Sequence, residues 1–234
     1  MSVPNMKCPK NGNVLVIYPH PDDELVFSGG LINKLSQCKD VKLYVISTTR
    51  GEYGDELLKL PPKELGQVRS AEFTEVMNIL GCKNFNLWDF TDGQMTSQKE
   101  EIKEKVRESI KKFNINLVVT YEKFGLYGHP DHIILSMIVH ELEEEMGFKV
   151  LYATLPEKIL KKLNMPKTLT YKDKVIDLKL DGIAKPEFKL NTTLNIPERY
   201  ECAKKYKSQN IDRGRPLWLV NLFTNYEYYT TKYE

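Results

Sequence analysis

The sequence lacks an apolar run long enough to cross a bilayer, which takes about 20 residues, and residues 1–13 lack the hydrophobic stretch of a secretory signal. It also has little net charge: 34 basic and 32 acidic residues leave +2, and the lysines are dispersed. A protein that binds nucleic acid normally has a cluster of basic residues on one surface. We therefore expect a soluble protein with no integral membrane association and no nucleic-acid partner.

Cysteine is scarce, and its four positions are far apart: Cys8, Cys38, Cys82 and Cys202. There is no Cys-x-x-Cys pair, which argues against a zinc ribbon, a dithiol redox motif and a cysteine nucleophile. This usage suits reduced thiols in a reducing compartment, so we predict a cytoplasmic location.

Strand-like and helix-like segments alternate along the first two-thirds of the chain. Short apolar runs predict strands at 14–18, 41–47, 84–90 and 116–121. Helical spacing of apolar residues predicts helices at 64–80, 102–113 and 134–146, the first ending at Gly81. Strands that alternate with helices of this length predict an α/β fold, a Rossmann-like three-layer α/β/α arrangement with a mostly parallel sheet.

The alternation weakens after Leu155, where prolines recur. In this part we expect a β-hairpin arm at 171–180, a helix at 198–208 and a tyrosine-rich tail that closes a sheet edge. We predict a single domain over residues 1–234, with a core at about 13–155 and a small C-terminal extension at about 156–234.

Two clusters of histidine and aspartate follow predicted strands. The first is His20-Pro21-Asp22-Asp23-Glu24 and the second is His129-Pro130-Asp131-His132. Because the carboxyl ends of parallel strands meet at one sheet edge, we expect the clusters to converge there, with Arg50-Gly51-Glu52 and Asp92-Gly93 nearby. Such a set can bind a divalent metal and leave acids and bases for chemistry.

A catalytic zinc site usually has three protein ligands and one open position. His20, Asp23 and His132 provide such a set. Asp22 would then lie beside the metal, as a general base toward water that the metal activates.

The second cluster supplies two further candidates. A protonated His129 would stabilise an oxyanion and then protonate a leaving amine, and Asp131 would fix the tautomer of an imidazole. Each piece also has a structural interpretation: a His-Pro-Asp turn, or an aspartate that caps the following helix. Three of the four histidines lie in these two turns, which favours the metal site. The fourth, His140, is expected on a helix face.

The residues Tyr18-Pro19-His20-Pro21-Asp22-Asp23-Glu24, followed by Gly29-Gly30, resemble the signature of the zinc-dependent LmbE/PIG-L de-N-acetylases. Gly128-His129-Pro130-Asp131-His132 resembles the second motif of that family. Thr49-Arg50-Gly51-Glu52, Arg69-Ser70-Ala71-Glu72 and Tyr127 are also similar to family positions. The resemblance covers about residues 13–148 and is thin beyond them. Pro19 departs from the small residue that is usual there.

The resemblance implies an enzyme that hydrolyses the N-acetyl group of a small molecule containing N-acetylglucosamine. It implies zinc on His20, Asp23 and His132, although such a set does not exclude iron(II). It also implies a base at Asp22 and an oxyanion-stabilising or acid group at His129.

Four further positions come from the same resemblance. Tyr127 matches an active-site tyrosine, and Arg69, Asp92 and Glu52 match substrate-contacting positions. An ion pair with Glu72 remains an alternative for Arg69, as a plain turn does for Asp92.

Two other functions stay open. A metallohydrolase of a carboxylic or phosphate ester would use similar groups, and a non-catalytic sugar-binding protein would keep the same scaffold. The partner we expect is a small amino-sugar substrate. Its aglycone cannot be read from the sequence, and a homo-oligomer also stays open.

Overall fold

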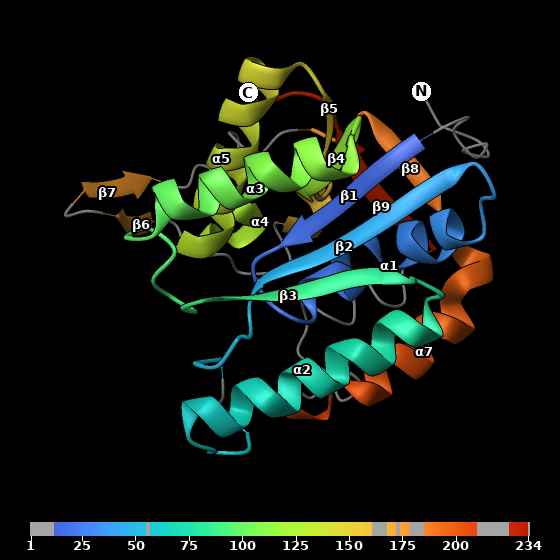
Figure 1. The fold of residues 1–234 in the computed structure, drawn as a ribbon, viewed down its shortest axis with the longest axis horizontal. Coiled ribbons are helices and arrows are strands. Elements are labelled where there is room, and N and C mark those ends of the chain that lie inside the picture. Colours follow the sequence, from blue (N-terminus) through green and yellow to red (C-terminus); the bar gives the residue numbers. More distant parts are fainter. Residues whose placement is uncertain are drawn as a thin grey trace.

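The computed structural model describes residues 12–54, 57–160, 168–171, 174–177, 185–209 and 225–233. Its main sheet has the strand order β3-β2-β1-β4-β5-β9-β8 (Figure 1). The strand bounds are β1 Gly12–Tyr18, β2 Val41–Thr49, β3 Asn84–Phe90, β4 Leu117–Tyr121, β5 Lys149–Ala153, β8 Phe188–Asn191 and β9 Tyr226–Thr230. Strands β1 to β5 are parallel, and β9 and β8 each run antiparallel to their neighbours.

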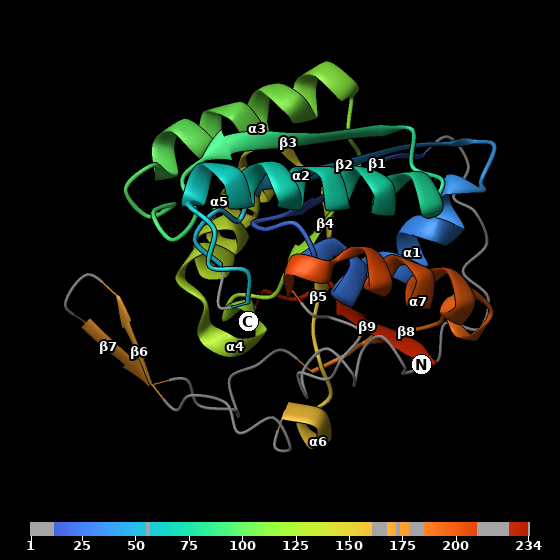
Figure 2. The ribbon, with the colours of Figure 1, turned by 90° about the horizontal axis from the view of Figure 1, so that it is seen from below.

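Helices cover both faces of this sheet (Figure 2). On one side lie α1 Asp23–Ser36, α2 Pro62–Ile79 and α7 Ile196–Lys205, and on the other lie α3 Lys99–Phe113 and α5 Pro130–Met146. Two short helices, α4 Gly125–Gly128 and α6 Glu157–Leu160, follow β4 and β5. The predicted three-layer α/β fold with a mostly parallel sheet is confirmed, as are the four predicted strands.

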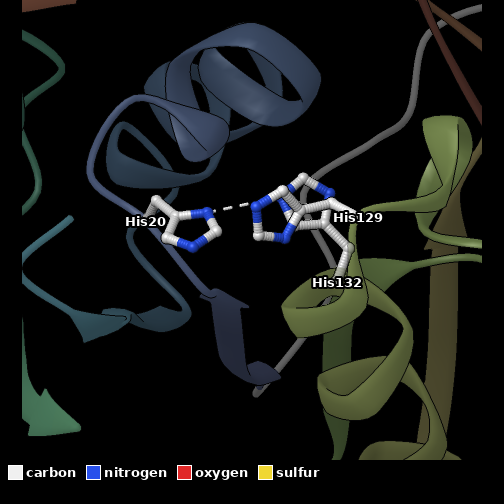
Figure 3. Close-up of side chains that lie close together, drawn as sticks. All are labelled: His20, His129 and His132. Atoms are coloured by element: carbon white, nitrogen blue, oxygen red, sulfur yellow. Dashed lines mark hydrogen bonds between the residues drawn. The ribbon is translucent and has the colours of Figure 1, made fainter. Parts of the chain in front are cut away.

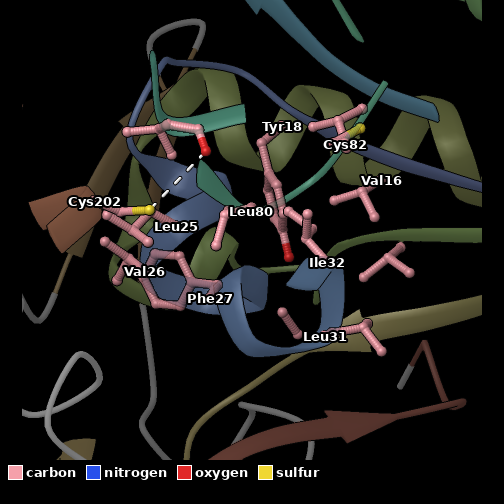
Figure 4. Close-up of a cluster of buried hydrophobic side chains, with 14 of the residues drawn as sticks. Val16, Tyr18, Leu25, Val26, Phe27, Leu31, Ile32, Leu80, Cys82 and Cys202 are labelled. Carbon is pink, nitrogen blue, oxygen red and sulfur yellow. Dashed lines mark hydrogen bonds between the residues drawn. The ribbon is translucent and has the colours of Figure 1, made fainter. Parts of the chain in front are cut away.

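The central strand β1 is buried on both faces. Val14, Val16 and Tyr18 belong to the apolar cluster shared with α1 and α2 (Figure 4), whereas Leu15 and Ile17 belong to the cluster beneath α3 and α5. Successive side chains of a strand point to opposite faces, so a strand between two helical layers needs apolar residues at every position. This explains the uninterrupted apolar run that precedes His20.

The strand order reverses beside β1. The chain passes from β1 to β2 on one side, and β4 is the neighbour on the other. In such a sheet a crevice opens beyond the carboxyl ends of the two strands at the reversal, because their connections leave in opposite directions. The loop after β1 begins at Pro19 and the loop after β4 begins at Glu122, so both histidine clusters follow the carboxyl ends of the two strands at the reversal.

The C-terminal third follows the predictions in part. A hairpin is present, formed by β6 Thr168–Tyr171 and β7 Lys174–Asp177, and it begins earlier than expected. The tyrosine-rich strand β9 lies between β5 and β8, so the expectation that it closes an edge is wrong; β8 is the edge strand. The predicted helix at 198–208 ends at Lys205 and gives way to a 3₁₀ turn, η3 Lys207–Gln209, because Tyr206 has a non-helical ψ of 60°.

Two findings bear on the sequence-based exclusions. Within the residues that the structure describes, no helix combines the length and apolar character needed to span a membrane. Cys82 and Cys202 are buried free thiols, whereas Cys38 is disulfide-bonded. The expectation of reduced thiols is therefore wrong for Cys38.

Candidate metal centre and active site

The acidic side chains of the turn between β1 and α1 are buried, and the residue at the helix start does not use its side chain as a cap. Asp22 occupies the N-cap position of α1 but makes no side-chain capping bond, and its φ is 113°. At the second cluster the cap of α5 is His129, whose Nδ1 accepts from the backbone N–H of Asp131 at 3.2 Å. The capping interpretation is therefore wrong for Asp22 and Asp131, and both carboxylates are available for other contacts.

Three side-chain atoms from the two clusters form a nearly equilateral triangle. His20 Nδ1 lies 3.3 Å from Asp23 Oδ2, His132 Nε2 lies 3.4 Å from the same oxygen, and the two nitrogens are 3.4 Å apart. All three side chains are buried, and Figure 3 shows the facing rings of His20 and His132. Ligand atoms at 2.0–2.1 Å from a tetrahedral zinc lie about 3.3–3.4 Å from one another. The triangle thus fits one face of a tetrahedral metal site.

The outer nitrogen of each imidazole is held by an oxygen acceptor. His132 Nδ1 lies 3.2 Å from the carbonyl of Gly125. His20 Nε2 lies 3.0 Å from Asp92 Oδ1 and 3.3 Å from Asp131 Oδ2. Because each acceptor requires a proton on the nitrogen it faces, both lone pairs are left on the inner nitrogens, where a metal can take them.

The electrostatics of the cluster favour a positive charge between these groups. Burial alone would lower the pKa of His20, but hydrogen bonds to Asp131, Asp23 and Asp92 raise it well above its usual value. Although burial raises the pKa of Asp23, the imidazoles of His132 and His20 bring it well below its usual range. A divalent cation would satisfy the same carboxylates. Two further groups of side chains are also close enough to hold an ion: His20 with His129 and His132, and His20 with Asp92 and Asp131.

Asp22 is buried beside the triangle and faces a guanidinium. Its Oδ2 lies 3.2 Å from Arg69 NH2, and the side chains are only 5% and 3% exposed. Burial raises the pKa of Asp22 above its usual range, and the Arg69 charge partly offsets that rise. A carboxylate with raised basicity next to a metal site suits the role of a general base.

His129 completes the polar wall opposite His20. Its ring centroid is 4.8 Å from that of His20 and 4.8 Å from that of His132 (Figure 3). Burial, together with these two imidazoles, lowers the pKa of His129 to about 3. This environment disfavours the protonated ring, and the role of His129 as an oxyanion-stabilising or acid group stays a prediction. Since its Nδ1 accepts from Asp131, the neutral ring carries its proton on Nε2, where it can donate to a substrate oxygen.

Comparison with known proteins agrees with this geometry. A sequence profile of the family described as GlcNAc-PI de-N-acetylase (PIG-L) matches residues 15–142, which is more than half of the chain. The chain belongs to this family. The matched region contains both histidine clusters and ends inside α5, before β5 begins.

Two curated relatives are sugar deacetylases by name. The chain is 28% identical over 165 residues to 1D-myo-inositol 2-acetamido-2-deoxy-alpha-D-glucopyranoside deacetylase of Corynebacterium diphtheriae, covering 61% of this chain and 56% of the relative. It is 30% identical over 150 residues to the probable N-acetyl-alpha-D-glucosaminyl L-malate deacetylase 2 of Bacillus anthracis, covering 62% and 61%. The matches thus span little more than half the length of these relatives.

A solved structure extends the likeness to nearly the whole chain. The N,N'-diacetylchitobiose deacetylase from Pyrococcus horikoshii superposes with a TM-score of 0.67 at 18% identity, covering 93% of this chain and 82% of the other. At this identity the likeness concerns the fold. It includes the C-terminal third, which the PIG-L profile does not reach.

The tyrosine that resembles a PIG-L active-site residue lies against the triangle. The hydroxyl of Tyr127 is 3.4 Å from His132 Nε2. Tyr127 belongs to α4, whose middle residues have non-helical angles, with Leu126 at φ 64°. Glu122 secures this segment by accepting the backbone N–H groups of Phe124 and Leu126. A catalytic role for Tyr127 stays a prediction that its position supports.

The three residues expected to contact substrate, Arg69, Asp92 and Glu52, form hydrogen bonds within the protein. Arg69 donates to the carbonyls of Pro21 and Gly51, and Asp92 binds His20 and the N–H of Tyr53. Both residues therefore help to hold the site together, and their contact with substrate stays a prediction. The alternative ion pair between Arg69 and Glu72 is not formed, because Glu72 instead accepts from the backbone and hydroxyl of Ser208.

The two carboxylate oxygens of Glu52 differ in their hydrogen bonding. Its Oε1 accepts the backbone N–H of Asp92. Its Oε2 is buried and has no hydrogen-bond partner within the part of the chain that the structure describes. Substrate contact through Glu52 stays a prediction.

Two groups near the metal centre had no signal in the sequence. Tyr121, the last residue of β4, stacks on His132 with ring centroids 4.2 Å apart. Tyr206 donates its hydroxyl to Glu24 at 2.5 Å, although the two are 182 residues apart. Burial raises the pKa of Glu24 to about 7.

Proposed function

We propose that this protein is a zinc-dependent hydrolase that removes the N-acetyl group from an N-acetylglucosamine unit of a small molecule. The observation that carries the proposal is the triangle of His20, Asp23 and His132, with edges of 3.3–3.4 Å, next to the buried carboxylate of Asp22. The PIG-L relatives named as deacetylases of glucosamine conjugates support the substrate class. Iron(II) is an alternative metal, because it accepts the same donor set.

The proposed chemistry assigns a distinct task to each side chain. When bound, the cation would polarise the amide carbonyl and make a water molecule more acidic. Asp22 accepts the proton that this water releases and, as the amide C–N bond breaks, returns a proton to the amine nitrogen. His129 donates from Nε2 to the developing oxyanion. Arg69 keeps the Asp22 carboxylate in place through its contact at 3.2 Å.

We also propose that residues 1–234 act as one catalytic domain. The support is the continuation of the main sheet from β5 into β9 and β8. The predicted cytoplasmic location stays a proposal, and the disulfide at Cys38 weighs against it.

The test is the release of primary amine and acetate from a panel of N-acetylglucosamine derivatives by zinc-loaded protein. The panel contains the free sugar, its inositol and malate conjugates, and N,N'-diacetylchitobiose. We expect turnover of at least one conjugate and, for Asp22→Asn, about a hundred-fold or greater loss of kcat with zinc content unchanged. Asp89→Asn is the matched control, because Asp89 is an exposed partner of Arg50.

Three results would count against the proposal. Failure of the zinc-loaded wild type to release amine from any member of the panel would exclude this substrate class. Loss of bound zinc in Asp22→Asn would show that Asp22 is a ligand instead of the base. Hydrolysis of acetyl or phosphate esters with two metals per chain would favour the ester hydrolase instead.

A further inference from the structure

The turn that carries Asp22 is held by a residue from the distant C-terminal part of the chain. The Tyr206 hydroxyl donates to Glu24 Oε1 at 2.5 Å, and Glu24 Oε2 accepts the backbone N–H of Asp22 at 2.9 Å. All three residues are buried. We propose that Tyr206 is a positioning residue for Asp22 and acts through Glu24. This inference rests on the proposed function, in which Asp22 is the base.

The backbone of Asp22 needs such support. Its φ of 113° lies in a region that residues with a side chain rarely adopt. Such a conformation persists only where surrounding contacts impose it, and it is common at functional sites. Here it determines where the Asp22 carboxylate points, so a bond to the Asp22 N–H is also a constraint on the proposed base.

Glu24 can hold the Asp22 N–H only while its own carboxylate is fixed. One oxygen faces Asp22 and the other faces Tyr206. Without the hydroxyl, a buried carboxylate oxygen would lose its donor, and rotation toward another donor would release the N–H of Asp22. Two hydrogen bonds, from Tyr206 to Glu24 and from the Asp22 N–H to Glu24, therefore connect the C-terminal segment to the turn. We call this pair of bonds the Tyr206 relay.

The same C-terminal segment also holds the second support of Asp22. Two residues after Tyr206, Ser208 donates through its backbone N–H and its hydroxyl to Glu72 on α2. That helix carries Arg69, which contacts the Asp22 carboxylate and the carbonyl of Pro21. Residues 206–208 therefore secure both the backbone and the side chain of the proposed base from outside the region that the family profile matches.

The chain contains a control of similar construction. The Tyr229 hydroxyl lies 2.9 Å from Glu227 Oε2, and it also lies 3.1 Å from the Phe27 carbonyl and from Ser28 Oγ. The Glu227 carboxylate accepts the N–H groups of Gly30 and Leu31. Both tyrosines are buried and both relays end on α1 or its first turn. Only the Tyr206 relay ends at Asp22. Tyr229→Phe therefore removes a buried tyrosine–carboxylate bond, together with the contacts to Phe27 and Ser28, without touching the proposed base.

The test compares Tyr206→Phe with Tyr229→Phe in the full-length protein. In the metal-free form, we expect hydrogen exchange of a peptide containing Asp22 to quicken about tenfold in Tyr206→Phe, and that of a peptide containing Leu31 to quicken in Tyr229→Phe. In the zinc-loaded form, we expect Tyr206→Phe to lower kcat about tenfold, with KM and zinc content within about twofold of wild type. Tyr229→Phe should keep kcat near wild type.

Unchanged exchange at Asp22 in Tyr206→Phe would overturn the proposal, as would equal losses of kcat in both variants. If Tyr206→Phe does not fold, Glu24→Gln replaces it, because the amide has one acceptor oxygen for two donors; normal exchange at Asp22 in that variant would also overturn the proposal. The exchange measurement needs no substrate. It therefore tests the relay even if no deacetylase activity is found, and the failure of either idea can be recognised separately.

Discussion

The ring of His132 lies flat against the ring of Tyr121, with centroids 4.2 Å apart and planes inclined by only 9°. Tyr121 is the last residue of β4 and is fully buried, so the sheet itself provides the platform for this imidazole. The contact fixes the plane of the ring, and the Gly125 carbonyl fixes its proton. The protein therefore orients His132 before any metal binds. This lowers the entropic cost of metal binding, because the ligand is already ordered.

Replacement of Tyr121 by leucine removes this platform while keeping an apolar side chain of moderate size. We expect Tyr121→Leu to weaken zinc binding by roughly tenfold or more, in the range of changes to groups that orient a metal ligand. Tyr121→Phe keeps the stacked ring and serves as the control. Competition with a chromophoric chelator measures both affinities, and equal affinities in the two variants would show that the stacking is irrelevant to the metal.

A methyl group on Gly125 should displace the same histidine from the other side. A Cβ there would lie 2.4 Å from the Cβ of His132, and φ at this glycine is +58°. Gly147 has a similar φ of +74° with nothing within 4 Å, so Gly147→Ala reports the conformational cost alone, about 1–2 kcal/mol. We expect Gly125→Ala to lose more stability than Gly147→Ala in urea unfolding and, unlike it, to lose zinc affinity. Equal behaviour would mean that the loop moves aside without affecting His132.

The metal triangle could be predicted because its members sit at fixed distances from apolar runs. His20 follows β1 and His132 begins a helix shortly after β4, and neighbouring parallel strands bring such positions together. The contacts that orient these ligands could not be predicted in the same way. The carbonyl of Gly125 carries no side-chain signal, and the bond between Tyr206 and Glu24 joins residues 182 positions apart.

The strand order beyond β5 also could not be predicted from the sequence. Whether β9 or β8 lies at the edge depends on non-local pairing, and both are short segments of mixed polarity. The inward placement of Arg69 was also not readable. Helical spacing predicts a neighbour on the same helix, whereas a guanidinium that reaches across to Pro21 and Gly51 depends on how α2 packs.

Glu122 should make the stability of the protein depend on pH. Burial raises the pKa of Glu122 to about 7 from an ordinary value of 4.5. The native state therefore binds this proton more tightly than the unfolded chain does. The contribution of Glu122 to the free energy of unfolding is fully present below about pH 4.5 and is lost as pH rises through about 7. The total change is at most roughly 3 kcal/mol. Urea unfolding at pH 5 and pH 8 should show a smaller difference for Glu122→Gln than for wild type, and an identical difference in both would contradict the assignment.

The carboxylates behind His20 should control which of its nitrogens is free for the metal. Asp131 Oδ2 accepts the backbone N–H of Gly93 as well as facing His20 Nε2, and its Oδ1 accepts the N–H of Met95. An asparagine there has one acceptor oxygen for these donors. Its amide nitrogen would oppose a donor, and the simplest relief is a proton on His20 Nδ1, the atom needed by the metal.

We therefore expect Asp131→Asn to weaken zinc binding by about 10- to 100-fold. Asp92→Asn should act in the same direction, because its oxygens accept from His20 and from the backbone N–H of Tyr53. Asp89→Asn, at an exposed position, should leave zinc affinity unchanged. The histidine ring resonances in NMR spectra of the metal-free variants identify the protonated nitrogen directly. A weakened affinity with His20 still protonated on Nε2 would mean that charge, and not the tautomer, is what these carboxylates supply.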